Sequence, residues 1–516
     1  MMETLYYGGT IDTMEPGRTA QAVLVRDDVI AAVGTLEEVS AAAGPKTLRR
    51  NLDGACLIPA LIDAHSHLCS YAQSLRLCDL SQAHCMDDII ASLRRQPPSG
   101  GWIVGFGYDH SILSEGRHPA RKELDQVSKE LPVLVTHASG HMGAVNTAAL
   151  AQMGIDRTTP NPDGGIIARQ DDGETPNGFL EENAFFTAGG CVPPATEQEM
   201  RALLRRAEQI YLSHGIATAQ EGLAKEAEMS LLRTSDLTLD VVAYIDQKDH
   251  AALLEQYRDH VGRYQNHLKV GGYKIFLDGS PQGRTAWLSA PYLGENRDYA
   301  GYPALTDQQV AFFVEQAERE GVQLLAHCNG DRAAEQFLAA HSHPSRHRDV
   351  MIHAQLLRRD QLEEVKRLGI LPSFFVSHTY YWGDVHIQNL GSERASVISP
   401  AGSAARMGIP FTLHADTPVL PPDLLDCLWC ATQRETRQGV RLAQEEALSV
   451  TQALRALTLD GAYQYFEETV KGSIRVGKYA DFALLSAPLY DGMSQDEIRK
   501  IEVLETIRRG QTVFAR

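Results

Sequence analysis

The chain has 516 residues, 43% of them hydrophobic and 22% charged, which is ordinary for a soluble globular protein. Its formal net charge of -18 argues against nucleic-acid binding, because proteins that bind phosphate backbones need basic faces. No run approaches about 20 apolar residues, and the opening residues lack the basic start and apolar core of a signal peptide. Eight cysteines in so long a chain fit a reduced compartment rather than a disulfide scaffold. We therefore predict a cytoplasmic protein that binds neither nucleic acid nor membrane.

Short apolar strands with glycine turns begin the chain. Over residues 3–56 the expected strands are Leu5–Gly8, Ala22–Arg26, Val29–Val33 and Thr47–Asn51, with a hairpin turn at Asp27-Asp28. The C-terminal stretch repeats this pattern with Phe482–Leu485, Glu502–Arg508 and Gln511–Phe514. Neither end could bury a core alone, so we expect residues 1–56 and 460–516 to form one β-sandwich together.

The next apolar run, Leu57–Ala64, predicts a buried strand that leads into His65 and His67. Side chains alternate between the two faces of a strand, so histidines separated by one residue point the same way. Two imidazoles at the C-terminal end of a strand form half of a metal site. For an isolated pair, the alternative is two rim histidines that hydrogen-bond to loops.

A long insertion follows this strand, because residues 69–196 far exceed the length of an ordinary connection. It contains Trp102–Asp109, Leu131–His137 and a Gly/Asp/Pro-rich stretch from Asn161 to Gly178 that is typical of a β-hairpin or flap. Insertions at this position usually cap the pocket and select the substrate. We therefore expect residues 69–196 to cap the site.

Seven more strand candidates follow the insertion: Gly215–Gln220, Leu237–Ile245, Gly271–Leu277, Val322–Cys328, Asp349–Ala354, Gly369–Phe375 and Pro410–Asp416. Amphipathic segments expected to be helical lie beside them at Glu197–His214, Ala251–Tyr264, Thr306–Glu320 and Arg358–Leu368. Eight repeats of strand then helix predict an α/β fold with a closed TIM (β/α)8 barrel over residues 57–68 and 197–459. A doubly wound sheet is the weaker alternative.

Residue types that bind metals recur at or near the C-terminal ends of these strands. They are His65, His67, Lys274, His327, His353 and Asp416. In a parallel barrel the C-terminal ends converge on one mouth. Imidazoles and carboxylates are good ligands for zinc-like ions, so the pattern indicates a metal site there.

Five of these six residues lie within longer motifs, which are Gly54–His67, Lys274–Ser280, His327–Ala333 and His353–Gln355. Two further motifs are His137–Asn146 and Gly472–Asp481. As a set the motifs resemble the amidohydrolase superfamily over essentially the whole chain, and more nearly its branch with N-substituted formamide deformylase. The chain departs from the branch pattern at Ile352, where relatives often carry Glu, and at Cys328-Asn329, where they carry Ala-Ile. It also reads His414-Ala415-Asp416 where relatives usually read Gly-Ser-Asp.

The resemblance implies two divalent transition-metal ions, zinc or another, per chain. His65, His67 and Asp416 would hold the more buried ion, and His327 and His353 the more exposed one. Lys274 would bridge the ions only as a carboxylated lysine, since an ammonium group repels cations. The alternative is a plain lysine paired with Asp278 or with a substrate acid, in which case one metal is expected.

The implied reaction is hydrolysis of a C–N bond in an amide-like small molecule, such as an N-substituted formamide, an N-acyl compound or a cyclic amide. A metal-activated hydroxide attacks, and Asp416 acts first as general base and then as general acid. One alternative is a deaminase of the same fold with one metal. The other is a non-catalytic regulatory binding protein. The fold is also compatible with a homodimer.

Five residues are candidates for substrate binding: His137, His141 and Asn146 in the insertion, and His378 and Trp382 after the seventh strand. Turn capping by His141 and Asn146, and loop packing by Trp382, are the structural alternatives. Asp109 is a weaker candidate. Asp331 would orient His327, or else cap the helix that follows it.

Overall fold

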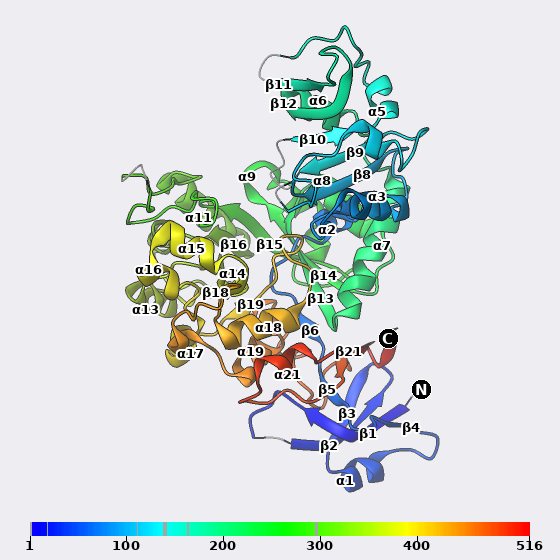
Figure 1. The fold of residues 1–516 in the computed structure, drawn as a ribbon. Coiled ribbons are helices and arrows are strands. Elements are labelled where there is room, and N and C mark those ends of the chain that lie inside the picture. The colour runs from blue at the N-terminus through cyan, green and yellow to red at the C-terminus, as the bar shows by residue number, and fades with distance from the viewer. Residues whose placement is uncertain (1–2, 18, 111, 138–141, 163–164, 295–297) are drawn as a thin grey trace. The chain divides into compact units, whose positions relative to one another are not determined.

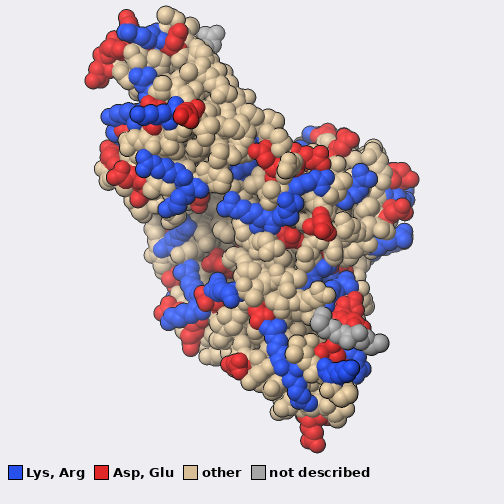
Figure 2. Space-filling model, turned by 90° about the vertical axis from the view of Figure 1, so that its right-hand side faces the viewer, with Lys and Arg blue, Asp and Glu red and all other residues tan. Residues whose placement is uncertain are grey.

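The computed structural model describes residues 3–17, 19–110, 112–137, 142–162, 165–294 and 298–516. The chain divides into two compact units, one of residues 1–68 and 208–516 and one of residues 69–207. Within the described part, no helix is both long enough and apolar enough to cross a membrane. Figure 2 shows that basic and acidic side chains lie interspersed over the face drawn there.

One sheet of the first unit combines strands from both ends of the chain (Figure 1). Its strands are β1 (Glu3–Asp12), β2 (Thr19–Arg26), β3 (Val29–Gly34), β4 (Leu48–Asn51), β5 (Cys56–Pro59), β20 (Phe482–Leu485), β21 (Val503–Arg508) and β22 (Gln511–Ala515). The order is β22-β21-β20-β5-β1-β2-β3, and β4 pairs with β1. The antiparallel pairing of β20 with β5 joins the two ends.

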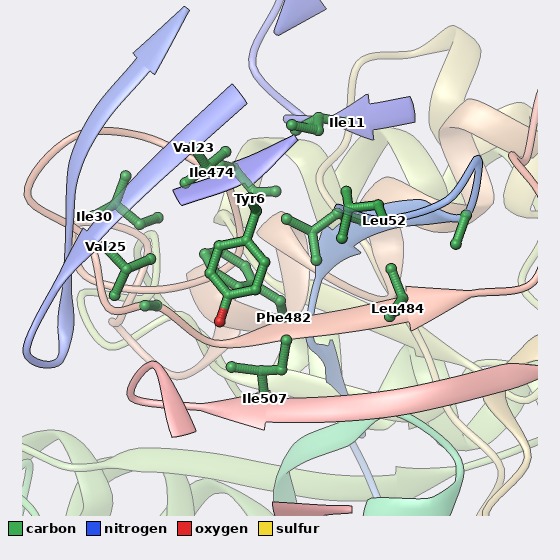
Figure 3. Packing of buried hydrophobic residues seen from close by; sticks show 13 residues of the cluster. Tyr6, Ile11, Val23, Val25, Ile30, Leu52, Ile474, Phe482, Leu484 and Ile507 are labelled. Atoms are coloured by element: carbon green, nitrogen blue, oxygen red, sulfur yellow. The ribbon is translucent and has the colours of Figure 1, made fainter. Parts of the chain in front are cut away.

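Apolar side chains from both ends share one core beneath this sheet, as Figure 3 shows. The ring of Tyr6 meets the ring of Phe482 edge to face, with 5.8 Å between centroids. Val23 and Ile507 are fully buried in the same cluster. The two ends are therefore interdependent, because both supply buried side chains to this core. The structure has one sheet here, and its description as a sandwich remains a prediction.

The second sheet of this unit contains eight parallel strands. They are β6 (Leu61–Ile62), β13 (Ile216–Ala224), β14 (Asp240–Asp246), β15 (Leu268–Phe276), β16 (Gln323–Cys328), β17 (Val350–His353), β18 (Leu371–Phe374) and β19 (Thr412–Leu413). They pair in chain order from β6 to β19. The seven strand predictions after the insertion are thus confirmed in place, with shifted boundaries.

The extensions of the two edge strands meet beyond the ladders. The Asp416 amide donates to the carbonyl of His65 at 3.3 Å, and the His67 amide donates to the carbonyl of Thr417 at 2.7 Å. These bonds bring the segments that follow β6 and β19 together at the C-terminal end of the sheet. Full closure into a TIM barrel remains a prediction.

The predicted strand Leu57–Ala64 is wrong as a single element, because the chain changes sheets within it. Cys56–Pro59 forms β5 in the terminal sheet, whereas Leu61–Ile62 forms β6 in the parallel sheet. The amide of Ala60 donates to Asp481 O and the next amide donates to Gly215 O, so the crossover occurs at one residue. Both halves are buried, which is why a continuous apolar run did not reveal the change.

The helices and 3-10 turns (η) of this unit are α1 (Leu36–Ala42), α8 (Glu226–Thr234), α9 (Gln247–His250), α10 (Leu253–Gln256), η1 (Arg258–His260), α11 (Asp307–Glu320), α12 (Asp331–Ala339), α13 (Arg359–Leu368), α14 (His378–Tyr381), α15 (Gly383–Leu390), α16 (Ser392–Ser396), α17 (Ala401–Arg406), α18 (Leu424–Gln433), η2 (Gln444–Glu446), α19 (Val450–Ala456), α20 (Leu459–Gln464) and α21 (Gln495–Arg499). The predictions of α11 and α13 are confirmed. The helix predicted over 251–264 is wrong, because only α10 and η1 form before Val261 leaves to bridge Val270 of β15.

The second unit has a six-stranded mixed sheet of order β11-β12-β10-β9-β8-β7. Its strands are β7 (Cys78–Asp79), β8 (Ile103–Tyr108), β9 (Val133–His137), β10 (Met142–Val145), β11 (Gly165–Arg169) and β12 (Pro176–Glu182). The helices are α2 (Leu68–Ser74), α3 (Met86–Arg95), α4 (Arg121–Leu124), α5 (Thr147–Gln152) and α6 (Asn183–Gly190), and α7 (Glu197–Ser213) spans the boundary. The hairpin expected near 161–178 is present as the antiparallel pair β11 and β12.

Candidate metal centre

Three ligand-type side chains of the first unit converge where the parallel strands end. They are His65 after β6, His353 at the end of β17 and Asp416 after β19. Each offers one atom, and the three atoms lie within 4.8 Å of one another. Nitrogen and oxygen donors at this spacing match the ligands that zinc-like ions prefer.

His65 is held in one orientation by Gln220 of β13. The Nδ1 atom of His65 lies 2.6 Å from Gln220 Oε1, and the Gln220 amide nitrogen donates to Ala64 O and to the Tyr465 hydroxyl. Because Gln220 Oε1 can only accept, Nδ1 must carry the proton and Nε2 keeps its lone pair. That Nε2 faces Asp416 Oδ1 at 3.3 Å.

Asp416 is the shared carboxylate of the cluster. Its Oδ1 also lies 3.7 Å from His67 Nε2, and its Oδ2 lies 4.0 Å from His353 Nε2. Burial raises the pKa of this carboxyl group, although the surrounding cationic groups oppose the shift. A carboxylate with a raised pKa is suited to accept and return a proton near neutral pH.

The backbone at these positions is strained. His353 has φ 72 and Asp416 has φ 54, in the left-handed region that usually takes glycine. Such conformations cost about 1–3 kcal/mol each and cluster at functional sites. The fold therefore retains a ligand-type side chain at two positions where glycine would be less strained.

His353 is oriented by a chain of buried polar groups. Its Nδ1 lies 3.1 Å from His414 Nε2, and His414 Nδ1 lies 2.8 Å from the Ser373 hydroxyl. If Nδ1 of each ring donates along this chain, the lone pair of His353 Nε2 faces the cluster. Burial and neighbouring positive charges hold the pKa of His353 and His414 well below the usual value, so both rings are neutral at pH 7.

His327 of β16 extends the cluster on the other side of His353. Its Nδ1 lies 3.0 Å from His353 Nε2, while its Nε2 lies 3.2 Å from Gly279 O and 3.0 Å from the Asn329 amide nitrogen. Asn329 Nδ2 also donates to Gly279 O. The second nitrogen of His327 is thus engaged by Asn329 and a loop carbonyl, and Nδ1 is the atom directed at the cluster.

Lys274 of β15 lies fully buried beside His65, with 3.4 Å between its Nζ and His65 Nε2. Burial lowers the pKa of this amine to about 7, although Asp416 opposes the shift. Asp278, the alternative partner, accepts hydrogen bonds from the backbone amides of Trp287, Asn329 and Gly330. With its pKa near 7, a substantial fraction of this amine is neutral at pH 7 and has the lone pair that carboxylation by CO2 requires.

The other sequence candidates in this unit have defined surroundings. His378 is buried, with Nδ1 3.1 Å from His386 Nε2, and its ring lies 4.6 Å from those of Phe375 and Trp382. Asp331 begins α12 and accepts from the Ser289 amide and from Arg358, not from His327. The side chain that contacts His327 is Asn329, and a role for Asp331 in orienting His327 stays a prediction.

The remaining candidates belong to the second unit. Asn146 caps α5, and its Oδ1 accepts from Val133 and Ala149 while its Nδ2 donates to Ser128 and Leu131. These four bonds use the full capacity of an amide side chain, as expected for the capping alternative, and substrate binding by Asn146 stays a prediction. His137 lies at the end of β9 beside Asp109 and His110. His141 lies outside the described residues.

Three contributors were missed from the sequence: Gln220, Asn329 and His414. Gln220 lies on a predicted strand, but Gln does not suggest a metal. The spacing of His414 and Asp416 repeats that of His65 and His67, which was a usable signal. Asn329 follows His327 by two residues and could have been recognised in the same way.

Comparisons with known proteins agree with this geometry. A model described as "Amidohydrolase family" matches residues 50–514. N-substituted formamide deformylase of Arthrobacter pascens is 27% identical, with 96% of this chain and 95% of that protein aligned. Protein LONG AFTER FAR-RED 3 of Arabidopsis thaliana is also 27% identical, over 99% of this chain and 91% of its own length.

Solved structures share the fold. An uncharacterized metal-dependent hydrolase from Pyrococcus horikoshii OT3 superposes with a TM-score of 0.74 at 24% identity, covering 94% of this chain and 98% of that one. The family match extends from the end of the N-terminal strands to the last strand, and so includes every residue of the cluster. The chain therefore belongs to the amidohydrolase family and is a hydrolytic enzyme.

Proposed function

We propose that this enzyme hydrolyses the C–N bond of an amide-like small molecule, such as an N-substituted formamide, an N-acyl compound or a cyclic amide. The observation that carries the proposal is the convergence of His65, His353 and Asp416 within 4.8 Å at the C-terminal end of the parallel sheet. The name of the Arthrobacter relative supports the choice of an amide bond.

The donor set fits a divalent transition ion such as zinc. His65, His353 and Asp416 would hold one ion, His67 and His327 lie beside them, and Lys274 would contribute as a carbamate bridging a second ion. When bound, such an ion acts as a Lewis acid and lowers the pKa of a coordinated water.

The chain's own residues supply positioning and proton transfer. Gln220 and His414 direct Nε2 of His65 and of His353 into the cluster. Asp416 accepts a proton from the attacking water and returns it to the nitrogen of the leaving amine, so that no charged amide nitrogen is expelled. The raised pKa of Asp416 brings its proton affinity closer to neutral pH.

The first test measures metal content per chain on protein purified with bicarbonate and without chelator, beside a Lys274→Ala variant. Two equivalents at the hydrolytic centre, counted as the metal lost in a His65→Ala/Asp416→Asn variant, are expected in the parent and fewer in the Lys274→Ala variant. One equivalent that the variant retains would contradict the bridging role of Lys274 and favour a single-metal deaminase. No bound metal would favour the binding-protein alternative.

The second test measures hydrolysis of N-substituted formamides, acyl amino acids and cyclic amides by the metal-loaded enzyme. We expect release of a free amine from at least one class, and loss of at least about 1000-fold in kcat in Asp416→Asn when the rate is normalised to bound metal. An Asp491→Asn variant serves as a control for the charge change. A folded, metal-loaded enzyme inactive on all three classes would contradict the proposal.

Four wider features also remain proposals. The substrate is a small molecule rather than a nucleic acid or a membrane, the compartment is the cytoplasm, and the segment 69–196 caps the site. A homodimer also remains a proposal.

A further inference from the structure

A second group of ligand-type side chains lies entirely in the second unit. Asp109 and His110 directly follow β8, and His137 ends β9. The two strands are parallel neighbours in which Tyr108 pairs with His137. Because parallel strands that end at the same edge bring their following residues together, this edge is where an α/β sheet usually binds ligands.

The spacing of the three donor atoms matches one ion. His110 Nδ1 and His137 Nε2 are 3.2 Å apart, and Asp109 Oδ1 lies 3.6 Å from His137 Nε2 and 3.9 Å from His110 Nδ1. The point equidistant from these atoms in their plane is about 2.1 Å from each. Zinc–nitrogen and zinc–oxygen bonds have this length, about 2.0–2.2 Å.

The neighbouring side chains hold the imidazoles in place. His118 stacks on His110 with 4.1 Å between centroids, and on its other side stacks on Phe179 at 4.2 Å. The Tyr108 hydroxyl lies 3.1 Å from His118 Nδ1, and the Tyr108 ring meets the edge of His137. Rings fixed by packing lose little conformational freedom when they bind an ion.

Access differs from that of the buried cluster in the first unit. The side chain of His137 is 11% exposed, whereas those of Asp109 and His110 are 34% and 40% exposed. An ion could therefore enter from solvent. Three protein ligands also leave at least one coordination position for water or a small ligand, as in catalytic or exchangeable sites rather than structural ones.

We propose that Asp109, His110 and His137 form a second divalent transition-metal site, of zinc type, that joins the ends of β8 and β9. All three ligands belong to residues 69–207, whereas His65, His353 and Asp416 belong to the other unit. Loss of the second site would leave the proposed hydrolytic ligands intact, so the failure of either proposal can be recognised separately.

The test uses full-length protein stripped of metal, in a His65→Ala/Asp416→Asn background that removes the first centre. Titration with Co2+ is followed by visible absorption and by isothermal calorimetry. We expect one equivalent to bind. Adding His110→Ala and His137→Ala should weaken binding at least tenfold, whereas His84→Ala, which removes an exposed imidazole of the same unit, should not.

A measurement on the unmodified chain covers the case in which a variant fails to fold. Diethylpyrocarbonate modifies free imidazoles, and mass spectrometry locates the product. Bound Co2+ should protect His110 and His137 but not His84. Equal binding by the background and the cluster variant, no binding by the background, or no protection of His110 and His137 would each overturn the proposal.

Discussion

Replacing His414 with alanine is expected to weaken metal binding at the hydrolytic centre without unfolding the protein. The ring lies between Ser373 and His353, with contacts of 2.8 Å and 3.1 Å, and it is fully buried. Removing it leaves the Nδ1–H of His353 without its acceptor in a buried site. The ring of His353 can then rotate or change tautomer, and Nε2 is no longer directed at Asp416.

The magnitude follows from these contacts. Loss of a group that orients a metal-bound histidine typically costs 10–100-fold in metal affinity, or about 1.4–2.7 kcal/mol. A buried donor left without a partner costs about 1–3 kcal/mol, which is the same range. We therefore expect the dissociation constant for Zn2+ or Co2+ to rise between about tenfold and 100-fold.

The assay is competition for Zn2+ with a chromophoric chelator, with circular dichroism to establish that each variant is folded. His414→Gln and His414→Asn form a matched pair. The amide oxygen of Gln can reach the position of the missing Nε2, whereas that of Asn reaches only the position of Nδ1. Gln should therefore restore affinity and Asn should not. If folded His414→Ala binds Zn2+ as tightly as the parent, His414 does not orient the ligand.

Three further changes test the fold. Asp240→Asn should reduce the free energy of unfolding in urea titrations by about 3–5 kcal/mol, because the buried cations of Lys471 and Arg508 lose the carboxylate that they share. An unchanged free energy of unfolding would contradict this role of Asp240. Phe482→Ala should cost about 3–5 kcal/mol because it removes a ring packed between the two chain ends, whereas Phe312→Ala, at 54% exposure, should cost under about 1 kcal/mol. For Asp460, burial raises the folded-state pKa from 3.8 to about 6 even though Arg455 opposes it, so the folded form holds a proton that the unfolded chain releases. The parent should therefore lose stability relative to Asp460→Asn as pH rises from about 4 through 6, by at most about 3 kcal/mol and with no further change above about 7. A difference that is constant with pH would refute this.

Much of the fold could be predicted because its signals are local. The apolar runs that became β13 to β19 are short, and their length and the amphipathic segments near them distinguish them from buried helices. The predicted strand 57–64 failed because β5 and β6 are both buried, so that hydrophobicity continues across the change of sheet. The helix expected at 251–264 failed because a tertiary pairing of Val261 with Val270 overrides helical propensity.

The sequence by itself determined which residues could bind a metal, because ligand chemistry belongs to side chains and their place at strand ends follows from local pattern. It also indicated the insertion, through the length of chain between His67 and the next strand.

Only the tertiary structure decided how these groups are used. Whether Nδ1 or Nε2 of a histidine faces the cluster depends on partners that are distant in the chain, Gln220 for His65 and His414 for His353. The use of Asn146 also depends on distant partners, because backbone groups occupy its whole amide. Asp109, His110 and His137 come together only because β8 and β9 lie side by side. Distances between residues far apart in sequence depend on the packing of the whole chain, and no local pattern encodes them.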